Sequence, residues 1–172
     1  MSSYKIFTLL LLFVMSSIAN GVRIRETNMV FYVHGKNAAE IVVAGANGSS
    51  SEFGKFGTGV VMDVLVTWEP QNDSKVIGKA KGIYLFADAS GNRASSPMLI
   101  TIVFENDKNQ SDSYNSLQLQ GVDDLYGSKR EVSVVGGTGK FRFARGYAII
   151  TTETVDNGLL PVLKFDVTIR PL

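Results

Sequence analysis

Two adjacent carboxylates and a nearby guanidinium are the residues of this chain most suited to chemistry. Asp123 and Asp124 come shortly after the alternating run Ser116–Gln120, and Arg130 follows across a turn that contains Gly127. Burial at the mouth of a barrel would raise the pKa of an aspartate and let it donate a proton, while Arg130 holds a phenolic or anionic oxygen. Because neighbouring strand residues point to opposite faces, only one of the two acids should face inward. The plainer interpretation is a polar loop with solvated carboxylates, and the residues alone favour it.

Several other chemistries lack the residues that they need. The chain has no cysteine and one histidine, His34, which excludes disulfides, thiolate metal sites, a cysteine nucleophile and a multi-histidine metal cage. No Gly-x-Ser-x-Gly motif accompanies His34, so a hydrolase triad is not indicated. The segment Gly136–Lys140 is glycine-rich, but Phe141 follows the lysine where a phosphate-binding loop needs Ser or Thr. We therefore expect a tight turn there, no metal and no cofactor.

A second set of candidates could line a ligand cavity. Asp63 stands within the apolar run Gly59–Trp68, so its carboxylate must face either solvent or a polar interior. Five aromatic residues within expected strands could surround a flat aromatic ligand, although each one alone is explained as well by a place in the core. These residues are Tyr32, Tyr84, Phe86, Phe104 and Tyr147.

The elements that must position these side chains are short β-strands. No window shows a sustained 3.6-residue apolar period, whereas nine β-rich runs are separated by turn residues at the spacing of an antiparallel barrel or sandwich. An eight-stranded barrel can hold one small ligand. The nine runs are Met29–Val33, Ile41–Val43, Gly59–Trp68, Val76–Phe86, Met98–Glu105, Ser116–Gln120, Glu131–Val135, Arg145–Thr154 and Lys164–Arg170.

The first residues have the pattern of a secretory signal. Lys5 precedes the apolar run Ile6–Met15, which is shorter than the roughly 20 residues of a membrane span. Small residues then favour cleavage after Ala19, or else after Gly21. We expect residues 1–19 to be removed, residues 20–172 to form one domain, and the protein to be secreted to the extracellular space without a membrane anchor.

Surface features agree with an extracellular protein. Asn47, Asn72 and Asn109 each begin an Asn-x-Ser motif in a polar segment, and we expect them to be glycosylation sites. The 17 basic residues balance the 16 acidic residues, so no positive field would attract nucleic acid.

Four sequence blocks, in order along the chain, resemble the plant dirigent family. Asn28–His34 resembles its opening strand, and Phe56-Gly57 with Asp63 and Thr67 resembles its next segment. The third block reads IGKAKGIY from Ile77 to Tyr84. The fourth and longest is Arg130–Ala148, which reads REVSVVGGTGKFRFARGYA.

This resemblance implies a fold and a function. The fold would be all-β, an eight-stranded antiparallel barrel with a central cavity, of the dirigent and allene oxide cyclase type, assembled as a homodimer or homotrimer. Family members impart stereoselectivity on phenoxy-radical coupling in lignan-type biosynthesis, with the radicals made by a separate laccase or peroxidase. Such a protein would have no catalytic activity of its own. Two alternatives remain open: a quinone-methide cyclase such as an isoflavanol dehydratase or pterocarpan synthase, or a defence-linked ligand carrier.

The resemblance also assigns site residues. Asp123 matches the family's acid and Arg130 the arginine that opens the longest block, which makes them the candidate catalytic pair. Thr152 and Tyr84 match substrate-binding positions, and Asp63 and Tyr32 are further candidates. Where the family usually has Asp after the histidine of its first strand, this chain has Gly35, so Asp123 would act alone or with Asp63.

Overall fold

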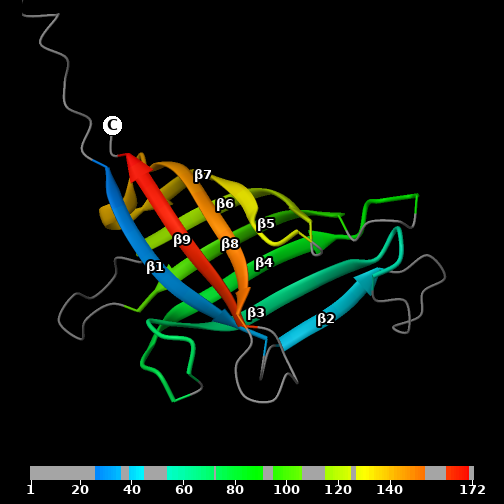
Figure 1. Cartoon of the computed structure of the whole chain (residues 1–172), viewed down its shortest axis with the longest axis horizontal. Coiled ribbons are helices and arrows are strands. Elements are labelled where there is room, and N and C mark those ends of the chain that lie inside the picture. The colour runs from blue at the N-terminus through cyan, green and yellow to red at the C-terminus, as the bar shows by residue number, and fades with distance from the viewer. Residues whose placement is uncertain are drawn as a thin grey trace, which may run out of the picture.

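In the computed structural model, most of the described residues belong to β-strands. Its described residues are 26–35, 39–44, 54–71, 73–90, 95–105, 115–124, 127–153 and 162–170. The strands are β1 (Thr27–His34), β2 (Ala39–Ala44), β3 (Gly59–Thr67), β4 (Val76–Leu85), β5 (Ser95–Phe104), β6 (Asn115–Asp124), β7 (Arg130–Thr138), β8 (Arg145–Glu153) and β9 (Val162–Arg170) (Figure 1). A single 3₁₀ turn, η2 (Gly139–Phe141), joins β7 to β8. No described helix has the length and apolar character needed to cross a bilayer.

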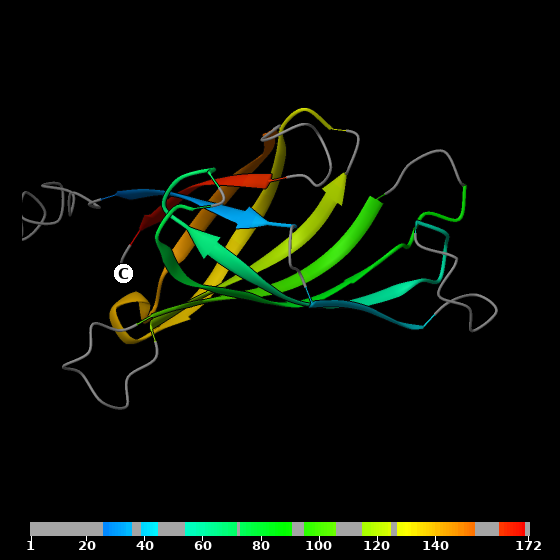
Figure 2. The same ribbon diagram turned by 90° about the horizontal axis from the view of Figure 1, so that it is seen from below.

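The strands form one antiparallel sheet that closes on itself. Its order is β1-β9-β8-β7-β6-β5-β4-β3-β2, and β1 also pairs with β3. Eight strands therefore make a barrel, as expected from the sequence, and β2 pairs with the part of β3 that β1 leaves free. In Figures 1 and 2, β1, β9 and β8 form one wall and cross the strands of the opposite wall steeply.

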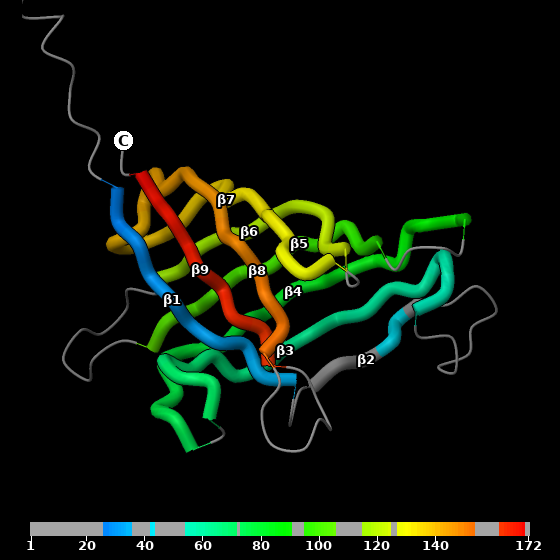
Figure 3. Tube along the Cα trace, viewed as in Figure 1, coloured from blue at the N-terminus to red at the C-terminus, as the bar shows by residue number. Residues whose placement is uncertain are grey.

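The seam between β1 and β3 is short. It consists of two pairs, Tyr32 with Thr67 and Val33 with Val66. Beside these pairs, the buried imidazole Nε2 of His34 lies 2.7 Å from Thr67 Oγ1. His34 is therefore a hydrogen-bonded residue at the end of β1. Figure 3 shows the end of β1 meeting β3 where β2 begins to follow it.

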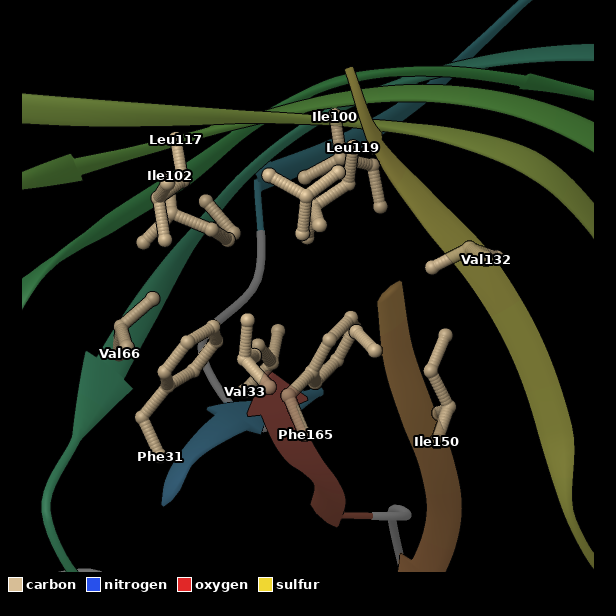
Figure 4. Packing of buried hydrophobic residues seen from close by; sticks show 14 of the residues in the cluster. Phe31, Val33, Val66, Ile100, Ile102, Leu117, Leu119, Val132, Ile150 and Phe165 are labelled. Carbon is tan, nitrogen blue, oxygen red and sulfur yellow. The ribbon is translucent and has the colours of Figure 1, made fainter. Parts of the chain in front are cut away.

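Alternation along each strand decides which side chains fill the barrel. On β5 the buried positions are every second residue, from Met98 through Ile100 and Ile102 to Phe104. Figure 4 shows side chains of this kind from opposite walls pointing toward one another. A side chain at Gly82 of β4 would place its Cβ 2.1 Å from the carbonyl oxygen of Leu99, so this glycine permits the close approach of β5.

Four phenylalanine rings, which we call the aromatic cluster, pack in series inside the barrel. The ring of Phe31 stacks on that of Phe165 with centroids 5.4 Å apart, and it meets the ring of Phe104 edge-on at 6.0 Å. The ring of Phe104 lies 5.2 Å from that of Phe141 in η2. The cluster thus runs from β9 through β1 to the end of the barrel where β5 finishes.

The segment after β7 closes this end. Gly139 has φ 58°, a left-handed conformation that suits glycine, and the turn brings Phe141 back over the barrel. A Cβ at Gly137 would lie 2.6 Å from Phe141 Cβ, so the absence of a side chain at Gly137 makes room for Phe141. Lys140 Nζ lies 4.9 Å from the Phe141 ring centroid and 5.8 Å from that of Phe104, as cation–π contacts over the cluster. The turn expected at Gly136–Lys140 begins only at Gly139, because Gly136, Gly137 and Thr138 continue β7.

Candidate functional site

At the opposite end of the barrel, four polar side chains lie on neighbouring strands. Ser96, Asp123, Arg130 and Thr152 come from β5, β6, β7 and β8, and we call them the polar row. Ser96 is the Cα partner of Asp123, which puts both on the inner face beside each other. Ser96, Asp123 and Arg130 are buried, whereas Thr152 is exposed at the rim. The strands therefore gather polar groups at one depth of an otherwise apolar barrel.

The centre of the row is an ion pair between Asp123 and Arg130. Arg130 Nη1 lies 3.3 Å from Asp123 Oδ1, and the two side chains are 2% and 9% exposed. The geometry does not make this contact a hydrogen bond, and Oδ1 has no hydrogen-bond partner among the described residues. The carboxyl group is thus close to a positive charge without being held by it.

Burial governs the ionisation of Asp123. Desolvation disfavours the carboxylate and raises the pKa of Asp123 above its ordinary value. The charge of Arg130 opposes this shift in pKa, and the neighbouring Asp124 adds to it. The result is a carboxyl group that keeps its proton to higher pH than a solvated aspartate, as a proton donor requires.

Asp123 and Asp124 behave as the alternation of a strand demands. Both belong to β6, where Asp123 is buried and Asp124 is half-buried on the other face. The interpretation of this segment as a loop with solvated carboxylates was wrong, because the strand continues four residues beyond the run that shows strict alternation. The expectation that one acid of the pair faces inward is confirmed.

Arg130 also connects the acid to β8. Its Nη2 donates a hydrogen bond of 3.0 Å to Thr152 Oγ1. Its buried Nε has no hydrogen-bond partner among the described residues. The guanidinium is therefore held by its hydrogen bond to Thr152 and lies beside Asp123, while its Nε–H remains available to a ligand oxygen.

Ser96 is a member of the row that the sequence analysis missed. It is 1% exposed, and its Oγ has no hydrogen-bond partner among the described residues. The signal was present in the alternation of β5, where Ser96 shares a face with Met98 and Ile100. A hydroxyl at the end of that apolar face breaks the pattern, and the strand prediction began two residues too late to include it.

Tyr84 lies on the inner face one layer deeper than the row. It pairs with Met98 of β5, which in turn pairs with Gly121 of β6. Its ring meets that of Phe86 edge-on with centroids 5.7 Å apart. Tyr84 is therefore placed between the polar row and the apolar core, as a substrate-binding residue would need to be.

Asp63 and Tyr32 lie on the outer face, contrary to the expectation that they line the interior. The inner face of β3 carries Met62 and Val64, so Asp63 points outward between Lys79 and Lys81, each 3.3 Å away. Partial desolvation is outweighed by these two ammonium groups, so the pKa of Asp63 is lowered. Tyr32 is half-buried between the buried Phe31 and Val33, and it pairs with Lys164 and with the buried Thr67. Asp63 and Asp123 therefore lie on opposite faces of the barrel wall.

Four further predictions fall outside the described residues. Asn47, Asn72 and Asn109, the expected glycosylation sites, all lie there, as does the expected signal segment 1–19. These stay predictions.

Comparison with known proteins relates this chain to one family. Residues 26–170 match the family model described as Dirigent-like protein. Pterocarpan synthase 1 of Glycyrrhiza echinata is 36% identical over 134 residues, which cover 76% of this chain and 69% of that protein. Dirigent protein 11 of Arabidopsis thaliana is 36% identical over 136 residues, which cover 76% and 67%.

A solved structure is similar to this chain in both fold and sequence. The pterocarpan synthase dirigent protein GePTS1 superimposes with a TM-score of 0.72 and 30% identity, covering 88% of each chain.

Proposed function

This chain belongs to the dirigent-like protein family, and from that premise we propose that it is a quinone-methide cyclase, which removes water from a phenolic substrate and closes a ring. The observation that carries the proposal is the buried Asp123 carboxyl group, which lies 3.3 Å from Arg130 and whose pKa is raised by desolvation. Two pterocarpan synthases at 36% identity support it, because that ring closure is chemistry of this kind.

The reaction follows from one proton donor and one fixed cation. Asp123 donates its proton to a hydroxyl oxygen on the carbon next to a phenol ring; the carbon–oxygen bond breaks and water leaves. The phenolic oxygen gives its proton to the Asp123 carboxylate, and its electrons form the quinone methide. A second phenolic hydroxyl of the substrate then bonds to the electrophilic carbon. The proton that this hydroxyl gives up passes to the quinone-methide oxygen, which restores the first phenol.

Arg130 and Thr152 orient the groups around this step. The free Nε–H of Arg130 can hold the quinone-methide oxygen, whose negative charge grows as the ring re-forms. Thr152 fixes the guanidinium through its 3.0 Å hydrogen bond. The net change is the loss of one water molecule, so the step balances without an oxidant.

Stereoselective coupling of phenoxy radicals, with a laccase or peroxidase as the oxidant, is the second candidate. An orientation preference of about 1.4 kcal/mol gives a tenfold excess of one product. The polar row could hold two aryl oxygens for this purpose, and the dirigent proteins among the relatives favour it as a family property. Coupling needs no proton from Asp123, and this distinguishes the two candidates.

The deciding experiment incubates an isoflavanol with the protein and follows the cyclised product by chiral chromatography. We expect turnover that falls by 10²- to 10⁴-fold in Asp123→Asn, the usual contribution of a general acid. Asp63→Asn, which changes an outward-facing acid, should retain activity. A parallel reaction contains coniferyl alcohol and a laccase. An excess of one lignan enantiomer in that reaction, together with no isoflavanol turnover, would contradict the cyclase proposal and support radical coupling.

We further propose secretion and self-association for this protein. The outer face carries a row of exposed apolar residues in register, Val61 with Ile83 and Ile83 with Leu99, on β3, β4 and β5. An apolar row of this kind favours burial against a second copy of the chain. Sedimentation of the protein as a monomer at micromolar concentration would contradict self-association, and retention of residues 1–19 by secreted protein would contradict cleavage.

A further inference from the structure

Three buried polar atoms in the polar row have no hydrogen-bond partner among the described residues. They are Ser96 Oγ, Asp123 Oδ1 and Arg130 Nε. Native interiors rarely leave such atoms unpaired, and where they do the cause is commonly a functional one. Arg130 Nε and Asp123 are already used by the proposed reaction, whereas that reaction gives no role to Ser96.

Ser96 and Asp123 lie directly opposite each other on the adjacent strands β5 and β6. They are Cα partners in the β5–β6 ladder and both side chains lie on the inner face. The Cβ atoms of such partners are about 4.5–5.5 Å apart, so rotation about one side-chain bond brings a serine hydroxyl to a carboxyl oxygen. The hydroxyl hydrogen itself rotates freely to suit its acceptor.

We propose that Ser96 is a positioning residue for Asp123: its hydroxyl turns to donate a hydrogen bond to the Asp123 carboxylate when the carboxyl group has given up its proton. The proton leaves Asp123 for a ligand oxygen or for water, and Ser96 keeps its own proton throughout. In the structure the hydroxyl has no hydrogen-bond partner among the described residues, which leaves it able to turn toward the carboxylate. In the ionised state it compensates a charge that is otherwise buried.

The surroundings of Asp123 leave this task to Ser96. The charged groups that act on it within the described residues are Arg130 on β7 and Asp124 on its own strand. Arg130 Nη1 faces Oδ1 without hydrogen-bond geometry. The partner strand β5 presents Ser96 and no charge at this position. Ser96 is therefore the neutral donor placed to satisfy the carboxylate.

The test is a carboxyl ¹³C NMR titration of the ligand-free, full-length protein labelled at aspartate, with the Asp123 signal assigned by its loss in Asp123→Asn. In Ser96→Ala we expect the midpoint of Asp123 to move up, so that the ratio of protonated to ionised carboxyl at a given pH rises about tenfold. Ser96→Thr keeps a hydroxyl and should restore the original midpoint. Ser133→Ala, on the exposed face of β7, is the matched control and should leave it unchanged.

An unchanged midpoint in Ser96→Ala, or an equal shift in Ser133→Ala, overturns the proposal. If Ser96→Thr does not fold, the comparison of the two alanine variants still decides. The titration needs no substrate, so it is independent of the proposed function on which the use of Ser96 in turnover rests. A shifted midpoint without isoflavanol turnover removes the function and keeps this inference; turnover with an unshifted midpoint does the reverse.

Discussion

The two ends of this barrel are built on opposite principles. At one end, the aromatic cluster ends in Phe104 and Phe141 under the ammonium group of Lys140, and the chain folds back through η2 to complete the packing. At the other end, Asp123 and Arg130 are buried as an ion pair that lacks a hydrogen bond. One strand, β5, joins the two regions, with Ser96 near its start and Phe104 at its end.

The difference shows that the residues that stabilise the fold and the residues suited to chemistry lie at different ends of the barrel. Ring packing buries apolar area and adds favourable edge-to-face and stacked contacts, so the aromatic cluster contributes free energy of folding. Buried polar atoms without partners cost free energy unless a ligand completes them. The barrel therefore holds the polar row in place with interactions made elsewhere, and substitutions at the two ends should affect different measurements.

The largest expected effect on stability comes from Phe31→Ala. Phe31 is fully buried and contacts both Phe104 and Phe165, so its loss leaves a cavity at the centre of the cluster. We expect about 3–5 kcal/mol less free energy of unfolding, measured by urea denaturation. The control is Phe143→Ala, which removes a ring that is 63% exposed and should change the free energy by under about 0.5 kcal/mol. Equal effects would mean that the cluster is not the stabilising region.

A smaller loss is expected from overpacking the same end. In Gly137→Ala the added Cβ would lie 2.3 Å from the Phe141 carbonyl oxygen and 2.8 Å from that of Ser116, both backbone atoms. Displacing them should cost about 1–3 kcal/mol and lower the thermal midpoint. Gly136→Ala meets only Gln118 Oε1 at 3.1 Å and Arg145 Nη1 at 3.7 Å, which are flexible ends, and should be tolerated. An unchanged thermal midpoint in Gly137→Ala would show that η2 can shift at little cost in free energy.

The smallest effect concerns the polar row and depends on pH. The pKa of Asp123 is raised in the folded state, so folded protein binds more protons than unfolded protein above the ordinary value of 3.8. This contribution to stability is present below that value and is lost as the pH rises through the folded-state pKa. Asp123→Asn removes the dependence, so the thermal midpoint of the variant relative to the wild type should rise between pH 4 and pH 8. A difference that stays constant with pH contradicts a raised pKa.

Much of the fold could be predicted because strand alternation is a local property. All nine β-rich runs correspond to strands of the barrel sheet. The local sequence does not decide which face of a strand lies inside the barrel. Asp63 and Tyr32 each stand next to residues that are compatible with either orientation. Their outward placement follows from the register of β3 with β4 and of β1 with β9.

The site was predicted in part for the same reason. Asp123, Arg130 and Thr152 come together as the resemblance implied, although a strand and not a loop carries the acid. Ser96 was missed because its role depends on being opposite Asp123 across the β5–β6 ladder, a pairing between residues 27 positions apart. Pairings of that kind arise only once the sheet has closed.

The barrel closes through a short contact between β1 and β3. Two residue pairs join these strands, and the hydrogen bond from His34 to Thr67 stabilises the closure. Thr67 Oγ1 in turn donates a hydrogen bond to the Glu69 carbonyl oxygen. Desolvation lowers the pKa of His34 below 6.5, so the unfolded chain takes up a proton more readily than the folded one. The contribution of this contact to stability is therefore fully present above pH 6.5 and is lost as the pH falls below that value.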